Sequence, residues 1–454
     1  MRALLTALCR LLLRIFFRRI DDVDRERVPT TGPLLYVLNH PNGLLDPLFI
    51  LCESPRPVTF LAKAPLFSTF LVKHFVRAFE CLPVYRAEDG ADPRKNREII
   101  EQSIRLLAGG KVLALFPEGT SHSDPKLKPL KTGAARIALC ASATGSGGTT
   151  EGEAVRIVPV GIDYRHKTTF RSDALLVYGQ AIVTPRVALD EQLRPSPEAV
   201  DALNLAIAKA LGEVTVQAED AAALRLAEQA ARILSGARRD VGEEPFDEAE
   251  VDFDIRRRLV EGYQRLRTLA PDRLEALAGR VRRYEAEMSM LGLPLDHPAA
   301  IPARAIRRYV IEHAVVLPLL LAPALIGIAT HYPAYRLVGW LSLRMAKNDD
   351  AVIATFKLIA GFLFFPLTWI VLAVVVGLLA TWPWALATLA LLPATGYAAL
   401  RFGERIGDMI DRARGLWVIT TRAGLTRRLT DERRGIHDAI MDLAATLDAD
   451  AGTG

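Results

Sequence analysis

The chain has few cysteines, and this scarcity excludes two common kinds of structural site. It contains four cysteines in 454 residues, and no two of them form a C-x-x-C pair or another metal-ligand spacing. We therefore expect neither a disulfide framework nor a bound metal, and we predict reduced, structural thiols in a cytosol-facing protein. The four residues are Cys9, Cys52, Cys81 and Cys140.

Other absences narrow the class of protein. The sequence has no internal repeat and no G-x-S-x-G elbow, the turn that presents the nucleophilic serine of α/β-hydrolases. Its formal net charge is +5, which is too small an excess over 454 residues to indicate nucleic-acid binding. A short Gly/Ser/Thr-rich stretch at residues 143–150 predicts a flexible loop.

Long apolar segments are what the chain has in excess. Half of its residues are hydrophobic, and residues 358–400 form a run of 43 without a charged side chain. Because one crossing needs about 20 helical residues, this run predicts two transmembrane helices, at about 358–379 and 382–400. Lys357 and Arg401 flank the run, so both ends are expected on the cytoplasmic side.

An earlier apolar run at about 314–330 is interrupted by prolines and a glycine and has basic residues on both sides. A single crossing would place one basic group on the wrong side of the membrane. We therefore predict a re-entrant or interfacial segment there, with a true crossing as the alternative. The whole membrane region is expected over residues 304–401.

The first 29 residues predict an amphipathic helix rather than a secretion signal. Arg10 and Arg14 interrupt the apolar stretch, and no small-residue cleavage site follows it. Leucines recur at helical spacing, which favours a helix lying on an anionic membrane face. The alternative is a helix that packs on the domain that follows it.

The remaining residues divide into three parts. Residues 30–215 alternate apolar strand patterns with helical patterns, which predicts an α/β domain with a central mixed sheet flanked by helices. Residues 216–303 predict an amphipathic helical region, and residues 402–454 a polar helical tail on the cytoplasmic side. The four expected strands are "GPLLYVLNH", "VTFLA", "KVLALFPEG" and "VRIVPVGIDY".

The stretch "NHPNGLLDP" carries a titratable pair at the end of the first of these strands. His40 would emerge at the carboxyl end of the strand, where ligand sites of α/β sheets gather. Asp46 precedes Pro47, so one reading of it is a helix N-cap and nothing more. The pair together favours a general base, because a carboxylate can fix the tautomer of a neutral histidine.

A second motif, "LALFPEGTSH", again runs from a buried strand into a turn. Glu118 and Gly119 stand at the end of that strand. A carboxylate and free backbone amides at such a place can hold a polyol hydroxyl and a phosphate. An ordinary Pro-Glu-Gly turn is the competing interpretation.

The motifs "NHPNGLLDP", "FPEGTSH" and "IVPVGIDY", in this order, resemble those of the lysophosphatidate and glycerol-phosphate acyltransferases, the glycerolipid acyltransferase superfamily. The resemblance covers about residues 30–215. It implies transfer of an acyl chain from acyl-CoA or acyl-carrier protein, as co-substrate, to a glycerolipid hydroxyl, with no other cofactor. It also implies that His40 is the base, that Asp46 is its charge partner and that Glu118 and Gly119 bind the acceptor. "CLPVYR" matches the second motif of the family, which suggests Arg86 as a phosphate contact, and Pro159 falls in the motif assigned to the acyl pocket.

Two departures from the family pattern refine this expectation. Five residues separate His40 from Asp46, where the common pattern has four. This resembles the fungal-type glycerol-3-phosphate and dihydroxyacetone-phosphate acyltransferases and their bacterial relatives. Ser121 stands where the family usually has an arginine, so the acceptor phosphate would need other cations. Four are at hand: Lys63, Arg86, Lys128 and Lys131.

The sequence therefore predicts a multi-pass membrane O-acyltransferase with its catalytic domain on the cytoplasmic side. The expected acceptor is glycerol 3-phosphate or dihydroxyacetone phosphate, in phosphatidic acid synthesis, and the expected partners are the acyl thioester and the lipid bilayer. A lysophosphatidate or other lysophospholipid acyltransferase is the close alternative. An inactive membrane scaffold and a transporter are more distant ones, because the catalytic pair is intact and the apolar segments hold no charges.

Overall fold

The computed structural model describes residues 2–69, 72–86, 90, 92–144, 154–240, 248–297, 303–347 and 349–451. The chain divides into two compact units. The first comprises residues 1–217 and 346–358, and the second comprises residues 218–345 and 359–454. Residues 145–150 of the expected Gly/Ser/Thr-rich loop lie outside the described residues.

The first unit is built on a mixed sheet of eight strands in the order β1-β7-β6-β2-β5-β3-β4, with β8 paired to β6. Strands β2 to β6 run parallel to their neighbours, whereas β7 and β8 are antiparallel to β6. All four strands expected from the sequence are present. The strands are β1 (Phe17–Val23), β2 (Leu34–Leu38), β3 (Val58–Lys63), β4 (Leu82–Val84), β5 (Val112–Leu115), β6 (Arg156–Tyr164), β7 (Ser172–Tyr178) and β8 (Ile182–Val183).

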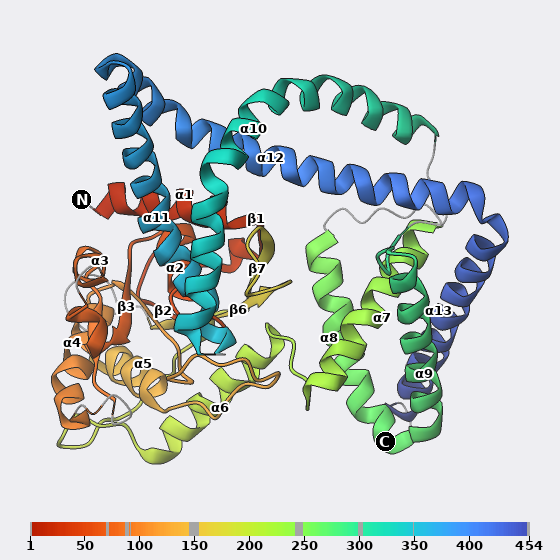
Figure 1. The fold of residues 1–454 in the computed structure, drawn as a ribbon. Coiled ribbons are helices and arrows are strands. Elements are labelled where there is room, and N and C mark those ends of the chain that lie inside the picture. Colours follow the sequence, from red (N-terminus) through yellow and green to blue (C-terminus); the bar gives the residue numbers. More distant parts are fainter. Residues whose placement is uncertain are drawn as a thin grey trace. The chain divides into compact units, whose positions relative to one another are not determined.

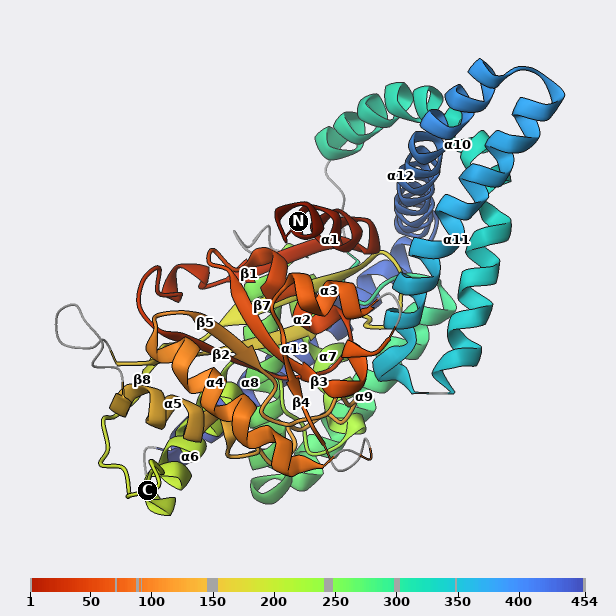
Figure 2. The same ribbon diagram turned by 90° about the vertical axis from the view of Figure 1, so that its left-hand side faces the viewer.

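Helices cover both faces of this sheet (Figures 1 and 2). Along β2, Tyr36 packs against one layer and Val37 against the other, as the alternation of a strand dictates. Burial on both faces explains why β2 reads as a continuous apolar run. One layer holds α1 (Arg2–Phe16), α2 (Leu45–Glu53) and α3 (Val72–Ala78), and the other holds α4 (Asn96–Ala108), α5 (Gly133–Thr144) and α6 (Pro197–Glu213).

Strand β1 lies in a region where the sequence predicted only an amphipathic helix over residues 1–29, so the sheet domain begins near residue 17 and not near residue 30. The strand was hidden because its inner positions are charged or half-exposed. It pairs with β7 at the edge of the sheet, and Arg18 bonds to Asp173 across that pair at 3.0 Å. An edge strand can carry charges of this kind along its middle, while Phe17 and Val23 at its two ends are buried.

Helix α1 has two apolar faces with different surroundings. Cys9, Leu13 and Phe16 are buried in the core of the first unit. On the other face, the exposed fractions are 75% for Leu4 and 55% for Leu11. The face with Cys9, Leu13 and Phe16 therefore packs on the domain that follows it. Membrane binding by the face with Leu4 and Leu11 stays a prediction.

The second unit gathers amphipathic helices around a core of their own. The expected apolar stripe is confirmed in α9, where Val281, Tyr284 and Met288 are buried. The C-terminal tail also has an apolar stripe: Leu429, Ile436 and Ile440 of α13 are buried in this core with side chains of α7 and α9. The sequence had not indicated that the two regions pack together. The helices are α7 (Ala221–Asp240), α8 (Glu248–Leu269), α9 (Pro271–Met290) and α13 (Ala423–Ala451).

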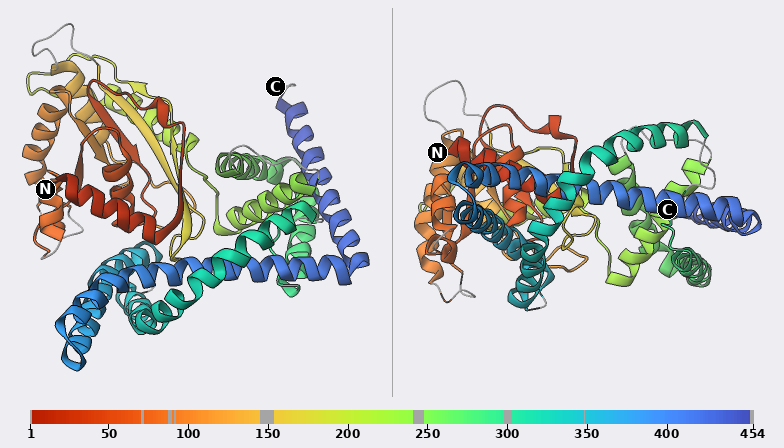
Figure 3. Two further views of the ribbon diagram at one scale, coloured as in Figure 1. Left: turned by 90° about the horizontal axis from the view of Figure 1, so that it is seen from above. Right: turned by 45° about the horizontal axis from the view of Figure 1, so that its top comes forward.

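In the part of the chain that the structure describes, three helices are long and apolar enough to cross a membrane: α10 (Ala303–Ala346), α11 (Asp350–Leu379) and α12 (Trp382–Thr421). Helix α11 begins at Asp350 rather than at about 358, and α12 runs as one uninterrupted helix far beyond residue 400 (Figure 3). The expected re-entrant stretch 314–330 lies inside the continuous helix α10, which contains three prolines. Its re-entrant character stays a prediction.

A histidine connects these three apolar helices. The Nε2 atom of His331 in α10 accepts a hydrogen bond from the indole of Trp369 in α11 at 2.8 Å. Its Nδ1 atom donates to the carbonyl of Gly327 at 2.8 Å. Gly396 of α12 lies so close to the ring that an added Cβ would be 2.8 Å from Nε2. Small residues and shared hydrogen bonds of this kind are how helices associate in lipid.

Arg433 provides a test of the second unit's core. It is 4% exposed and donates to Asp240 at 2.9 Å, to the hydroxyl of Tyr284 at 3.0 Å and to the carbonyl of His297 at 2.6 Å. Replacing Arg433→Met removes a charge partner of Asp240, whose side chain is 10% exposed. It should lower the free energy of unfolding by about 3–5 kcal/mol, measured by urea unfolding in detergent.

Two further variants control this prediction. The double variant Arg433→Met with Asp240→Asn should recover part of the loss, because it leaves no buried charge behind. Arg428→Met removes a pair with Glu287 whose side chains are 63% and 43% exposed, and it should change stability by about 1 kcal/mol at most. Equal losses for Arg433→Met and Arg428→Met would contradict the buried-charge explanation.

Candidate active site

The candidate residues stand at one edge of the sheet because parallel strands end there together. His40 follows β2, Lys63 ends β3 and Arg86 comes just after β4. Glu118 follows β5, and Tyr164 ends β6. Five separate segments of the chain thus bring their polar side chains to the same edge.

His40 and Asp46 form a direct hydrogen bond at this edge. The Nδ1 atom of His40 lies 2.7 Å from Oδ2 of Asp46, whose side chain is fully buried. The same oxygen accepts from the backbone amide of Asn42 at 2.7 Å, and the other oxygen accepts from the hydroxyl of Tyr164 at 2.5 Å. The carboxylate therefore has a donor on each oxygen without any contact to solvent.

The imidazole ring of His40 is held flat against Phe116. The ring centroids are 3.7 Å apart and the planes differ by 2°. The His40 side chain is 14% exposed. Among the described residues, no hydrogen bond involves its Nε2 atom. With Nδ1–H donated to Asp46, Nε2 carries the lone pair that could take a proton from a substrate.

Glu118 holds the backbone of His40 in place. Its Oε1 atom accepts from the amide of His40 at 3.1 Å, and Oε2 accepts from the amide of Lys128 at 2.8 Å and faces the ring of His122 at 2.5 Å. The amide of His122 in turn donates to the carbonyl of His40 at 3.0 Å. Both carboxylate oxygens are thus engaged within the protein, and contact of Glu118 with an acceptor stays a prediction.

Gly119 occupies a position that only glycine fits without strain. Its φ of +75° lies in the left-handed region, and an added Cβ would lie 2.7 Å from the ammonium of Lys131. The carbonyl of Gly119 accepts from the guanidinium of Arg86 at 2.7 Å. Three of the predicted residues, Arg86, Gly119 and Lys131, are therefore brought together.

The other predicted residues have different surroundings. Lys63 is exposed at the end of β3, and the ammonium of Lys128 lies 3.4 Å from Asp124. Pro159 is buried in the middle of β6, opposite Val37 and against Gly179. The structure thus places Pro159 within the sheet, away from the edge that carries His40.

The N-cap reading of Asp46 is wrong. Helix α2 begins at Leu45, its N-cap is Leu44, and Asp46 lies within the first turn. The amide of Asp46 donates to the carbonyl of Asn42 at 3.2 Å, which closes the turn back toward His40. That turn, rather than a capping bond, is what aims the carboxylate at the histidine.

Tyr164 and Lys167 belong to the site and were not found from the sequence. Tyr164 is the last residue of "IVPVGIDY", so its place at a strand end was the only available signal. Lys167 follows on the same segment, where its half-buried ammonium donates to the hydroxyl of Ser123 and to the carbonyl of Pro41, the latter at 3.4 Å. It adds a positive charge beside the loop that joins His40 to Asp46.

Burial sets the direction of each pKa shift in the site. It raises the pKa of Asp46 above its ordinary value, while the hydrogen bonds from His40, Tyr164 and Asn42 oppose that rise. Burial and the neighbouring Asp46 raise the pKa of Tyr164, so its hydroxyl remains a donor. Burial lowers the pKa of Lys167, and nearby carboxylates oppose the change.

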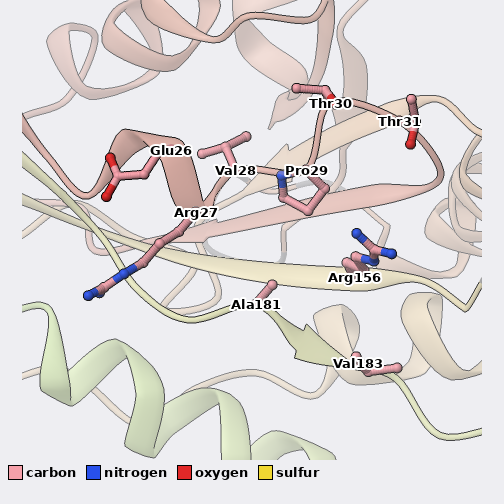
Figure 4. Close-up of a pocket in the computed structure, with 9 residues that line it drawn as sticks. All are labelled: Glu26, Arg27, Val28, Pro29, Thr30, Thr31, Arg156, Ala181 and Val183. Atoms are coloured by element: carbon pink, nitrogen blue, oxygen red, sulfur yellow. The ribbon is translucent and has the colours of Figure 1, made fainter.

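An open hollow of about 480 Å³ lies elsewhere on the first unit (Figure 4). It is lined by the chain before β2 and by the start of β6, including Thr31 and Arg156. Leu34 and Arg156 are paired at the amino ends of these strands, whereas His40 follows a carboxyl end. The hollow therefore lies at the opposite edge of the sheet and contains none of the candidate catalytic residues.

Two family models match the chain. Residues 19–163 match the family described as "Acyltransferase", and residues 248–451 match the "Glycerol-3-phosphate acyltransferase 2 C-terminal domain". The chain is thus an acyltransferase, and the two matches support a place in the glycerolipid acyltransferase superfamily. The match of residues 248–451 supports the fungal-type glycerol-3-phosphate acyltransferase branch of that superfamily.

Similar proteins agree with this assignment. A Schizosaccharomyces pombe protein described as an uncharacterized acyltransferase is 24% identical over 96% of this chain and 79% of its own length. Glycerol-3-phosphate O-acyltransferases 1 and 2 of Saccharomyces cerevisiae are each 27% identical over about three quarters of this chain. The matches span 46% and 50% of those two enzymes, about half their length.

One solved structure is also similar, that of a 1-acyl-sn-glycerophosphate acyltransferase from Thermotoga maritima. It is 17% identical, covers 47% of this chain and 80% of that chain, and has a TM-score of 0.34. A similarity of that size supports no inference about this site.

Tyr164→Phe tests the hydrogen bonds to Asp46. The variant removes a donor to a buried carboxylate, which should lower kcat about 10-fold. Since the lost bond had opposed the rise in the pKa of Asp46, the acid limb of the rate profile should move to higher pH. The measurement is kcat against pH for acyl transfer.

Tyr178→Phe is the matched control. Tyr178 is 1% exposed, and its hydroxyl has no hydrogen-bond partner in the described part of the chain. Its removal should leave both kcat and the acid limb unchanged. An unaltered profile for Tyr164→Phe would show that Asp46 does not depend on this donor.

Proposed function

We propose that the chain is a membrane-bound O-acyltransferase in which His40 and Asp46 act as a general-base pair. The supporting observation is the 2.7 Å hydrogen bond between Nδ1 of His40 and the buried carboxylate of Asp46. It fixes the tautomer in which Nε2 is the free, proton-accepting nitrogen. The donor is an acyl thioester, either acyl-CoA or acyl-carrier protein.

The proposed reaction has two steps. As the acceptor oxygen attacks the thioester carbonyl carbon, its hydroxyl proton moves to Nε2 of His40, and Asp46 stabilises the resulting imidazolium. When the tetrahedral intermediate collapses, the carbon–sulfur bond breaks and the leaving thiolate takes the proton from Nε2. The products are an ester and a free thiol, and no serine nucleophile is required.

The proposed acceptor is glycerol 3-phosphate or dihydroxyacetone phosphate. The match of the C-terminal domain to glycerol-3-phosphate acyltransferases supports this choice, because it extends over residues 248–451. A lysophosphatidate acceptor is the alternative. Relatives named 1-acyl-sn-glycerol-3-phosphate acyltransferase match only about a quarter of the chain. Lys63 is the proposed cation for the acceptor phosphate, since it is exposed at the same sheet edge as His40.

We further propose that α11 and α12 cross the membrane as a pair and that α10 does not cross it singly. No candidate span lies in the described residues between α6 and α10, so the first unit and α7 to α9 share one side. Helix α13 packs with α7 and α9, which returns the end of α12 to that side. Residues 346–358 belong to the first unit, so α10 also begins and ends there. The flanking basic residues make this side cytoplasmic.

His40→Ala and Asp46→Asn test the catalytic pair. Loss of the base should lower kcat by about 10²–10⁴-fold. Asp46→Asn should lower it by a similar factor, because an amide favours the wrong tautomer. The measurement is transfer of labelled acyl chains by the protein in membranes, with each acceptor and each donor supplied separately.

The chain offers a second histidine–aspartate pair as control. His437 lies 3.1 Å from Asp438 on the exposed side of α13. His437→Ala should retain full activity and equal expression in membranes. Near-normal turnover by His40→Ala would refute the catalytic role, and activity with lysophosphatidate alone would replace the proposed acceptor by its alternative.

Cysteine labelling from outside intact cells tests the crossing. Trp382→Cys, between α11 and α12, should react with a membrane-impermeant maleimide, whereas Trp340→Cys in α10 should not. The tryptophan side chains are 71% and 56% exposed, so protein packing shields neither position. The four native cysteines are buried and should give little background. Labelling at position 340 would show that α10 is a true crossing.

A further inference from the structure

The first turns of α11 belong to the core of the catalytic unit, although the rest of this helix is a candidate membrane span. Residues 346–358 cluster with the first unit. Ala351 and Ala354 are fully buried, and Ala354 packs in the same apolar core as Leu45 and Phe49 of α2. From Phe362 onward the apolar side chains of α11 are largely exposed. One helix thus serves two environments in succession.

These turns bond directly to the loop between His40 and Asp46. The amide of Gly43 donates to the carbonyl of Ala351 at 2.8 Å, and the amide of Leu44 donates to the hydroxyl of Thr355 at 2.9 Å. The fit is close, because a Cβ added to Gly43 would lie 3.0 Å from the Thr355 hydroxyl and 3.3 Å from the Ala351 carbonyl.

A further contact joins α11 to the segment that follows β6, which also lies beside Asp46. The ammonium of Lys357 donates to the carbonyl of Thr168 at 2.6 Å. The residue before Thr168 is Lys167, and its backbone carbonyl accepts a hydrogen bond of 3.2 Å from the side chain of Asn42. Asn42 is the residue whose amide bonds to Asp46. The first turns of α11 therefore hold the loop between His40 and Asp46 in two ways. They bond to it directly, and they bond to the segment after β6, which in turn bonds to Asn42.

We propose that Thr355 is a positioning residue for the His40–Asp46 pair, an inference that rests on the proposed catalytic role of that pair. Its hydroxyl fixes the peptide group of Leu44, two residues before Asp46, and so fixes where the carboxylate meets the imidazole. Thr355 acts through the loop and has no hydrogen bond to His40 or Asp46. Its loss should therefore lower kcat and leave the KM values for both substrates nearly unchanged.

Three variants in α11 test this inference. Thr355→Val keeps the shape of the side chain and removes its hydrogen-bonding oxygen. We expect kcat to fall about 10- to 100-fold, because small displacements of catalytic groups have effects of that size. Thr355→Ser keeps the hydroxyl and should restore most of the rate. Thr368→Val removes a hydroxyl whose one hydrogen bond within the described ranges goes to the carbonyl of Phe364 in its own helix, at 2.8 Å, and this variant should have no effect.

Gly43→Ala provides an independent approach from the loop side. The added methyl group would press on the Thr355 hydroxyl and the Ala351 carbonyl, so this variant should also lose kcat with little change in KM. Thermal unfolding in detergent is measured for every variant. A Thr355→Val enzyme that keeps the wild-type kcat would overturn the inference, as would one that raises KM instead of lowering kcat.

The two proposals fail differently. If His40→Ala is inactive and Thr355→Val is fully active, the catalytic pair stands and the positioning role of Thr355 is wrong. If His40→Ala remains active, the proposed base itself is wrong. If Thr355→Ser is as slow as Thr355→Val while both fold normally, the hydroxyl is not what positions the loop.

Discussion

A buried carboxylate must have hydrogen-bond donors, and the sheet edge that carries the candidate active site is arranged around that requirement. Asp46 is fully shielded from water, where an unsupported charge would be costly. Its donors come from three places in the chain: the ring of His40, the amide of Asn42 and the hydroxyl of Tyr164. These hydrogen bonds fix the loop after β2 and the end of β6 relative to each other. The need to stabilise one buried carboxylate therefore determines how these two segments are arranged.

The sheet makes this arrangement possible. Five strands, β2 to β6, end at a common edge. The segments after β2 and β5 and the last residue of β6 supply the contacts to His40 and Asp46. Phe116 and Glu118 both come from the turn after β5, where one stacks on the imidazole ring and the other holds its backbone. The ring of His40 is thereby fixed in plane and in position before any substrate binds, which is the condition for efficient proton transfer.

The sequence indicated the candidate residues His40 and Asp46, but it did not indicate the residues that hold them in place. His40 and Asp46 are recognisable because a strand pattern leads directly into them, and the four interior strands have continuous apolar runs. Strand β1 could not be found, since an edge strand with charged inner positions has no clear period. Tyr164 and Thr355 could not be found either, because their partners are 118 and 311 residues away in the chain and only the fold brings them together. Family similarity names the motifs of the first unit, whereas the contacts of α11 are visible only in the structure.

Because α11 contacts the loop at Gly43, the acyltransferase domain cannot be separated from the later part of the chain without losing hydrogen bonds. A fragment cut after Gln217 would contain every residue proposed to touch substrate, and by sequence similarity it would look self-sufficient. It would nevertheless lack the carbonyl of Ala351 and the hydroxyl of Thr355, which leaves the amides of Gly43 and Leu44 without these partners. Any shortened form of this enzyme would therefore need residues 346–358 joined to the fragment, because the first unit is made of two separate segments of the sequence.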